Sequence, residues 1–258
     1  MKKILVIALM LSFSYGLFAQ VGAYAGFNFA YNSTWLMNQQ VFDDGAGQDI
    51  DPSFNYYYGF MAGYKITNNI ALELNFNLNQ IEQKYTGSIN YYLTDRYNDY
   101  KSKTVLNTID IPLLAKFGER SYFEIGPVLQ IINKANYNID FENNHNLLSS
   151  YWYKDIELLP SSLYENEKNH NVIEDFNKIA FAVAMGFGSD VSLIEDVLAL
   201  NIGVRFQYTV SDLGGINGLG FNKDSNYVPE NLNNRKEKER FSTHPLFGGF
   251  KVGLKYCF

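Results

Sequence analysis

Cysteine, basic charge and long apolar runs are all scarce in this chain of 258 residues. Cys257 is the only cysteine, so no disulfide can form within the chain, and we interpret it as a packed side chain rather than a nucleophile. The formal net charge of −6 argues against nucleic acid as a partner, because such binding usually rests on a basic face. Beyond the N-terminal segment, no stretch reaches the roughly 18 apolar residues that a transmembrane helix requires.

Motifs of known catalytic and metal sites are also missing. The chain has no Gly-x-Ser-x-Gly and no His-Glu-x-x-His string. Its first acidic cluster does not match the EF-hand spacing and comprises Asp43, Asp44, Asp49 and Asp51. We therefore expect no cofactor, no bound metal and no enzyme. A rim enzyme is the least favoured class, and it would use the histidines of the predicted loops, His145, His170 and His244.

The N-terminus has the layout of an export signal. Lys2 and Lys3 precede a mostly apolar run over residues 4–18, and Ala19 offers a small residue before Gln20. This pattern is typical of a secretory signal peptide rather than a membrane-spanning helix. No cysteine follows the apolar run, which argues against lipidation. We predict a signal peptide over residues 1–19 and a single domain over residues 20–258.

Aromatic residues and period-two alternation are abundant. Tyr and Phe each occur twenty times, and eight segments alternate large apolar residues with small or polar ones. In the first segment Val21, Phe27 and Tyr31 share one face, and Gly22 and Asn28 share the other. Such alternation predicts strands with one apolar face. The eight segments are residues 21–31, 56–66, 70–79, 109–117, 123–131, 178–188, 198–208 and 246–258.

The connections between these segments alternate in length. Short ones fall at 67–69, 118–121 and about 189–197, and long ones fall at 32–54, 83–104, 133–177 and 212–245. Short periplasmic turns and long external loops are typical of outer-membrane barrels, whose strands need roughly 9–11 residues to cross. We predict an all-β fold: a closed antiparallel up-and-down transmembrane barrel of eight strands, with long external loops and both termini in the periplasm.

A water-soluble barrel is the alternative to this interpretation. It would bury its large apolar face and expose its charges. Here the large-residue face carries hardly a charge on any strand, whereas Gly, Ala, Asn and paired charges occupy the other face. An eight-stranded barrel has room inside only for side chains, so the small and polar face fits the interior and the large apolar face fits lipid.

Charged residues recur on the predicted inward face. They are Lys65, Glu73, Asp110, Lys116, Glu124, Arg205, Lys251 and Lys255. Lys65 with Glu73, and Lys116 with Glu124, flank short turns and are expected to be cross-strand neighbours of opposite charge. We interpret the set as a polar network that fixes the strand register, because an unpaired lumen charge would be costly. A narrow proton or ion path is the alternative interpretation.

The end of the chain and several internal fragments resemble known barrels. Phe258 and Tyr256 close an alternating strand, which resembles the signal for outer-membrane barrel insertion. The fragments Ile-Asp-Ile-Pro-Leu-Leu-Ala-Lys-Phe (109–117), Tyr-Phe-Glu-Ile-Gly-Pro-Val (122–128), Gly-Phe-Gly (186–188) and Tyr-Thr-Val-Ser-Asp-Leu (208–213) resemble the Bacteroidetes outer-membrane family called PorT-like, whose barrels are of the OmpA and OmpX kind. The segment 133–177 looks longer than in most members.

The resemblance implies an accessory role in type IX secretion or gliding. We therefore expect a non-enzymatic structural or interaction protein of the envelope, with a narrow porin-like channel for small solutes or ions as the alternative. The expected partners are outer-membrane lipid, the barrel-assembly machinery, and secretion or gliding components. Aromatics in the predicted loop 133–177 either anchor such a partner or fold onto the rim; they are Tyr137, Phe141, Tyr151, Trp152, Tyr153 and Tyr164.

Overall fold

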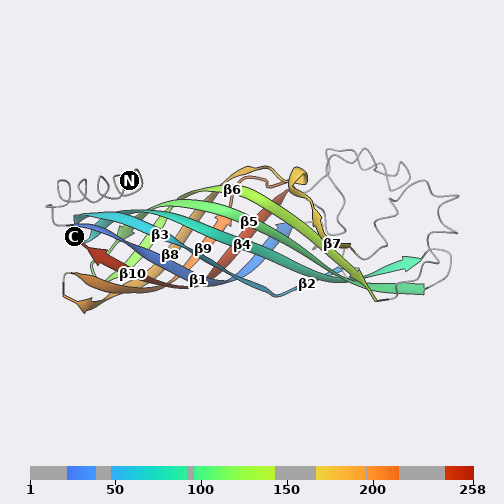
Figure 1. The fold of residues 1–258 in the computed structure, drawn as a ribbon, viewed down its shortest axis with the longest axis horizontal. Helices are drawn as coiled ribbons and strands as arrows, with labels where there is room; N and C mark the ends of the chain where they lie inside the picture. Colours follow the sequence, from blue (N-terminus) through green and yellow to red (C-terminus); the bar gives the residue numbers. More distant parts are fainter. Residues whose placement is uncertain (1–21, 39–47, 92–95, 143–166, 196, 215–241) are drawn as a thin grey trace, which may run out of the picture.

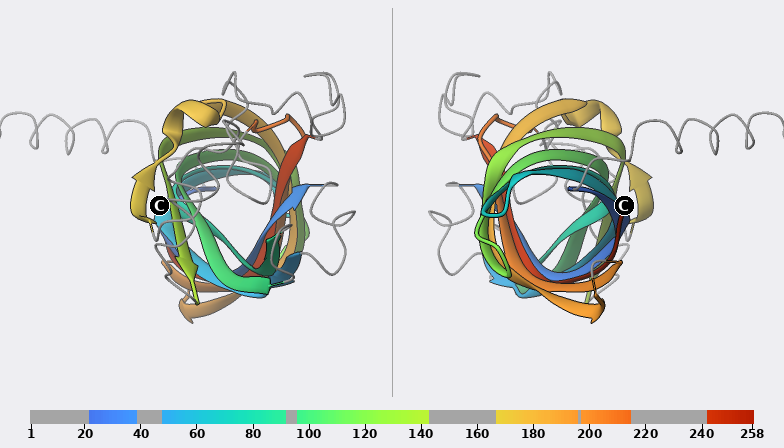
Figure 2. Two further views of the ribbon diagram at one scale, coloured as in Figure 1. Left: turned by 90° about the vertical axis from the view of Figure 1, so that its right-hand side faces the viewer. Right: turned by 90° about the vertical axis from the view of Figure 1, so that its left-hand side faces the viewer.

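The computed structural model describes residues 22–38, 48–91, 96–142, 167–195, 197–214 and 242–258. Eight long strands form a closed antiparallel ring in the order β1-β3-β4-β5-β6-β8-β9-β10, and β10 returns to pair with β1 (Figures 1 and 2). Their bounds are β1 (Ala23–Asn38), β3 (Ser53–Thr67), β4 (Ile70–Tyr91), β5 (Arg96–Phe117), β6 (Ser121–Phe141), β8 (Ile179–Ile194), β9 (Leu198–Thr209) and β10 (Thr243–Cys257). The predicted eight-stranded antiparallel barrel is confirmed.

The outer surface of the ring is apolar. Side chains on the outward parity are large and exposed, with exposed fractions of 61% at Phe27, 62% at Phe181 and 74% at Phe250. The belt runs from Ile66 and Phe117 at the end near the C-terminus, which we call proximal, towards the opposite, distal end. Because a soluble barrel would bury these residues, the water-soluble alternative is wrong. Among the described residues no helix has the length and apolar character needed to cross a membrane.

Three short turns join the strands at the proximal end. Two of them, at 68–69 and 118–120, lie where the alternation predicts them. Gly118 has a φ of +126°, a region that favours glycine. The third turn, expected at about 189–197, starts only after Ile194 because β8 continues beyond residue 188. The lipid-facing pattern weakens there at Ser189, and the strand includes an irregularity between Ser192 and Ile194.

At the distal end the predicted loops 83–104 and 133–177 were wrong in part, because β4, β5 and β6 continue well beyond the belt. They contain 22, 22 and 21 residues, about twice the expected crossing length. Two short strands extend this sheet, β2 (Gln48–Asp51) along β4 and β7 (Glu167–Asn171) along β6, and the helix η3 (Ile173–Asp175) follows β7. We call the part of this β2-β4-β5-β6-β7 sheet that lies beyond the belt the distal blade (Figure 1).

The predicted loops 32–54 and 212–245 are also shorter than expected, since β1 reaches Asn38, β3 begins at Ser53 and β10 begins at Thr243. Beyond the belt the outward positions no longer meet lipid, so they carry polar residues such as Lys84 and Lys103 and the apolar alternation disappears. The apolar alternation therefore predicted strands that are too short at their distal ends.

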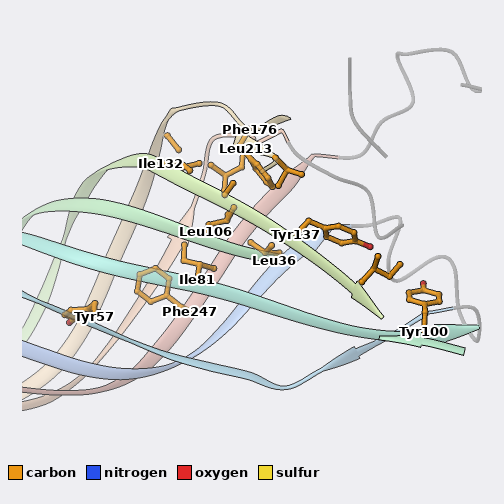
Figure 3. Close-up of a cluster of buried hydrophobic side chains, with 14 of the residues drawn as sticks. Leu36, Tyr57, Ile81, Tyr100, Leu106, Ile132, Tyr137, Phe176, Leu213 and Phe247 are labelled. Atoms are coloured by element: carbon orange, nitrogen blue, oxygen red, sulfur yellow. The ribbon is translucent and has the colours of Figure 1, made fainter. Parts of the chain in front are cut away.

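Inside the barrel, a cluster of buried apolar side chains lies in the distal part of the interior. The buried residues come from seven of the eight ring strands, and Leu213 lies just after the eighth, β9. We call this cluster the distal plug (Figure 3); it includes Ala30, Leu36, Tyr57, Ile81, Leu106, Ile132, Ala180, Leu213 and Phe247. Phe176 also packs in the cluster, and its segment is held by the hydrogen bond from Asn177 N–H to the Leu213 carbonyl (2.8 Å). The plug therefore closes the distal mouth within the described residues.

Candidate functional site

The structure places seven of the eight predicted lumen charges inside the barrel. Glu73, Asp110, Lys116, Glu124, Arg205, Lys251 and Lys255 are each no more than 3% exposed. Lys65 has the inward parity, but it lies at the proximal rim and is exposed. Its expected pairing with Glu73 was wrong, because Lys65 lies opposite Ala71 in the register and Glu73 lies opposite Gly63.

Glu124 on β6 is the centre of the charge network. Its carboxylate accepts a hydrogen bond from Arg205 Nε at 2.6 Å and from Lys251 Nζ at 3.0 and 3.1 Å. Lys116 lies directly opposite Glu124 in the register and places Nζ 3.5 Å from Oε2. One carboxylate thereby connects β5, β6, β9 and β10 across the lumen. Low surrounding polarity makes such contacts strong, and it makes the loss of one partner expensive.

Glu73 on β4 holds the second carboxylate of this network. It forms a short ion pair with Lys116, lies 3.8 Å from Arg205 Nη2, and accepts hydrogen bonds from Tyr24 OH (2.9 Å) and Asn75 Nδ2 (3.2 Å). Arg205 additionally donates to Tyr57 OH at 3.4 Å. The two glutamates therefore share the cations of β5 and β9, so side chains as well as backbone connect β4, β5, β6, β9 and β10.

Asp190 and two tyrosines belong to the network but were not predicted. Asp190 accepts hydrogen bonds from Lys255 Nζ at 2.6 and 2.8 Å. The sequence did not predict Asp190 as a lumen residue, because the alternation predicts a turn at 189–197. Tyr122 lies under three amines, with the Lys116, Lys251 and Lys255 nitrogens 4.4, 5.6 and 5.4 Å from its ring centroid. These contacts are within cation–π range.

Tyr24 and Tyr122 lie over glycines near the proximal mouth. A Cβ added to Gly63 would come within 2.3 Å of the Tyr24 ring, and one added to Gly188 would come within 2.3 Å of Tyr122 Oη. Both positions therefore require glycine for close approach. Asn201 Nδ2 donates to Tyr122 Oη at 2.7 Å and fixes that ring in place. The rings and their cations fill the proximal interior.

The carboxylate of Asp110 accepts hydrogen bonds from neutral side chains. Its Oδ1 accepts hydrogen bonds from Thr108 Oγ1 (2.8 Å) and Gln130 Nε2 (3.1 Å). Its Oδ2 accepts from Asn79 Nδ2 (2.9 Å) and Gln207 Nε2 (3.2 Å). Each oxygen thus has two neutral donors, which is the number of its lone pairs. This carboxylate ties β4, β5, β6 and β9 together between the charge network and the distal plug.

The remaining predicted residues lie elsewhere in the fold. Tyr256 and Phe258 face outward and contact each other edge to face at 5.0 Å, and Cys257 is half-buried. His170 lies on β7 and His244 on β10. Residues 1–19 and several predicted loop residues lie outside the described residues, namely Asp43, Asp44, His145, Tyr151, Trp152, Tyr153 and Tyr164. The described part of the chain contains no group of three or more metal-binding side chains.

The arrangement can hold the barrel shut and rigid. Three buried acids, Glu73, Asp110 and Glu124, and the partly exposed Asp190 accompany four basic side chains inside the barrel. The charge network fills the proximal half of the lumen and the plug fills the distal part. Some buried polar atoms, such as Asn77 Oδ1 and Arg205 Nη2, have no hydrogen-bond partner among the described residues.

Comparison with protein families agrees with the fold. A family model described as outer membrane protein beta-barrel domain matches residues 9–214. Neisserial surface protein A is 10% identical, with 92% of this chain and 97% of that chain covered and a TM-score of 0.38. OprG from Pseudomonas aeruginosa is 13% identical (93% and 99% covered, TM-score 0.32). The protease OmpT from Escherichia coli is 11% identical (93% and 98% covered, TM-score 0.31). No curated protein matches in sequence.

Proposed function

The chain belongs to the outer membrane protein beta-barrel family, and from this membership and its filled interior we propose a sealed outer-membrane barrel with a structural or interaction role. The observation that carries the proposal is that buried inward side chains of the described residues occupy both the proximal and the distal part of the lumen. Charged side chains with exposures of 0–3% fill its proximal part, and apolar side chains from nearly every strand fill its distal part. A narrow porin-like channel would need a continuous water path, and this interior disfavours one.

The proposed orientation places both termini in the periplasm. All three short turns lie at the same end as the C-terminus, and the blade lies at the other end. Outer-membrane barrels typically have short periplasmic turns and longer external connections, which supports a blade outside the cell. Tyr256 and Phe258 then lie on the lipid face near the periplasm, where we propose that they serve in recognition by the barrel-assembly machinery.

The distal blade is the surface we propose for partner contact. Its outer face has a groove of about 370 Å³. Charged side chains line much of this groove: Asp51, Lys84, Lys101, Lys103, Asp140 and Lys168. Glu82 pairs with Lys84 (3.3 Å) and Lys103 (2.8 Å), whose side chains stay 47% and 41% exposed. A mixed-charge face of this kind can steer a protein partner of complementary charge.

The PorT-like fragments support a finer proposal, in which the partner is a component of type IX secretion or gliding in a Bacteroidetes envelope. The fragments lie mainly on β5, β6 and β8, within the barrel wall, and the last one begins at the end of β9. They therefore support the type of barrel more strongly than the identity of the partner, and only a binding experiment identifies the latter.

One capture experiment tests orientation and partner contact together. An epitope is inserted between Tyr91 and Arg96, antibody is added to intact cells, and complexes are then solubilised in mild detergent and identified by mass spectrometry. We expect capture from intact cells together with stoichiometric secretion or motility components. Capture only after lysis contradicts the orientation, and recovery of the barrel alone contradicts the interaction role.

A blade-trimmed variant is the matched control. Gln83 and Thr104 face each other in the β4–β5 register, so a loop carrying the same epitope can replace residues 84–103, which include Lys84, Lys101 and Lys103 of the groove, without disturbing the belt. We expect this variant to insert normally and to lose the partner. If the trimmed barrel retains the partner in full, contact is made elsewhere on the molecule.

A further inference from the structure

A serine and a histidine form a hydrogen-bonded pair at the distal rim. Ser242 Oγ lies 2.8 Å from His244 Nε2, and His244 Nδ1 lies 3.0 Å from the carbonyl oxygen of Thr209. Ser242 is exposed and His244 is half-buried. Both have the outward parity of β10, shared with Leu246 and Phe250. The pair therefore lies on the outside of the barrel, away from the filled lumen.

The hydrogen bonds fix the tautomer of the histidine. A carbonyl oxygen can only accept, so Nδ1 must carry the proton that it donates to Thr209. In the neutral ring Nε2 then has a free lone pair and accepts the hydroxyl proton of Ser242. A nucleophile within hydrogen-bond reach of a base, and a base oriented by a third group, is the arrangement that activates serine in acyl transfer.

The rim around the pair is firmly built. Asp212 Oδ1 accepts the backbone N–H groups of Gly214 and Thr243, each at 2.9 Å. The N–H of Leu213 donates to the Thr243 carbonyl at 3.0 Å. The ring of His244 also stacks on Tyr208 with 5.7 Å between centroids. The base is thus held in a defined position by β9 and by the segment that follows it.

The position of the pair along the barrel defines the substrate class. Tyr208 lies opposite Leu246 in the register and is 44% exposed on the apolar belt, and His244 follows two residues beyond Leu246. Two residues correspond to about 7 Å along a strand. Ser242 and His244 therefore lie where the apolar belt ends. In a bilayer, the carbonyls that join acyl chains to headgroups lie at this boundary between hydrocarbon and polar region.

We propose that Ser242 and His244 form an acyl-ester hydrolase site for lipid of the surrounding leaflet. Ser242 Oγ bonds to the ester carbonyl carbon while His244 Nε2 takes the hydroxyl proton. The bond from that carbon to the alcohol oxygen breaks, and the histidine protonates the departing lipid alcohol. Water then adds to the acyl-serine with His244 as base, which releases the fatty acid and restores Ser242. The proposal goes beyond the interaction role and replaces the expectation of a protein without catalysis.

The described surroundings predict slow turnover. The N–H groups of Leu213, Gly214 and Thr243 are already engaged, so they do not stabilise an oxyanion at Ser242. Covalent capture of the serine is therefore a more sensitive readout than product release. A fluorophosphonate probe reacts with activated serines and is the reagent for the first test.

In the folded barrel, reconstituted in phospholipid vesicles, we expect the probe to label Ser242. Labelling should vanish in Ser242→Ala and fall at least tenfold in His244→Gln, since a positioned base typically contributes about 10²–10⁴-fold. Ser192→Ala removes an exposed serine at the proximal end of β8 and serves as the matched control, with full labelling. Absence of labelling above the Ser242→Ala level overturns the proposal, as does equal labelling of the His244→Gln protein.

A second arm identifies the source of the ester. The same proteins are incubated in vesicles of phosphatidylethanolamine alone and in vesicles that also contain lipid A, and released fatty acid is measured by mass spectrometry. Release that requires Ser242 from either lipid supports the proposal and names the substrate. No release from either lipid by a protein that the probe labels overturns the assignment to lipid esters. These readouts do not depend on blade partners, so their failure is distinct from a failure of the interaction role.

Discussion

Replacing Glu124 with alanine is expected to destabilise the barrel by about 3–5 kcal/mol, the usual cost of removing one partner from a buried ion pair. Three cations, Lys116, Arg205 and Lys251, lose their shared carboxylate at once. Because each is at most 3% exposed, none can turn to water. The expected readouts are a lower urea midpoint in vesicles and a lower temperature for loss of the compact form on SDS gels.

Two further variants distinguish the loss of the Glu124 charge from the loss of its side-chain volume and from a general effect of substitution. Glu124→Gln keeps the shape of the side chain and removes its charge, so it should retain most of the destabilisation. Glu119 is exposed on the proximal turn at 118–120, and Glu119→Ala should leave both midpoints unchanged. Unchanged heat resistance of Glu124→Ala would mean that the lumen network does not stabilise the barrel.

Asp110→Leu has the second large expected effect, because it leaves buried donors from Thr108, Asn79, Gln130 and Gln207 without their acceptor. Each buried donor left unsatisfied costs about 1–3 kcal/mol. Allowing for local rearrangement of the amides, we expect a loss on the order of 4 kcal/mol in the free energy of unfolding. Urea unfolding in vesicles, followed by tryptophan fluorescence, measures it.

Asp140→Leu is the matched control for this substitution. Asp140 is exposed on the outward face of the blade, so its replacement should change the unfolding free energy by less than about 0.5 kcal/mol. If Asp110→Leu is as stable as the unmodified protein, the four hydrogen bonds contribute no net stability and the connection between β4, β5, β6 and β9 rests on backbone pairing alone.

The alternation of outward residues was enough to predict the ring. Phe27, Phe60 and Phe181 are examples of the large apolar residues that occupy every second position of their strands, because lipid contacts every second residue. The same parity assigned Glu124 and Arg205 to the interior without any knowledge of strand neighbours. Parity alone does not predict the strand register. Lys65 and Glu73 both have the inward parity, but the pairing of β3 with β4 places each opposite another residue.

Parts of the structure that do not face lipid left no comparable pattern in the amino-acid sequence. The blade continues β4, β5 and β6 into water, where polar outward residues such as Lys103 remove the alternation. Asp190 follows Ser189, where the lipid-facing pattern weakens, and therefore resembles a turn residue, although it accepts hydrogen bonds from Lys255. The pairing of Ser242 with His244 depends on the carbonyl of Thr209, which no spacing in the sequence indicates.

Planar-bilayer recording tests most directly whether side chains close the lumen from end to end. The protein is inserted from vesicles in which its heat-modifiable gel migration verifies the folded barrel. The filled interior, from Glu124 to the distal plug, predicts a baseline without stable conductance steps at either polarity. Reproducible steps of a size that admits small solutes would contradict this closure and would favour a channel.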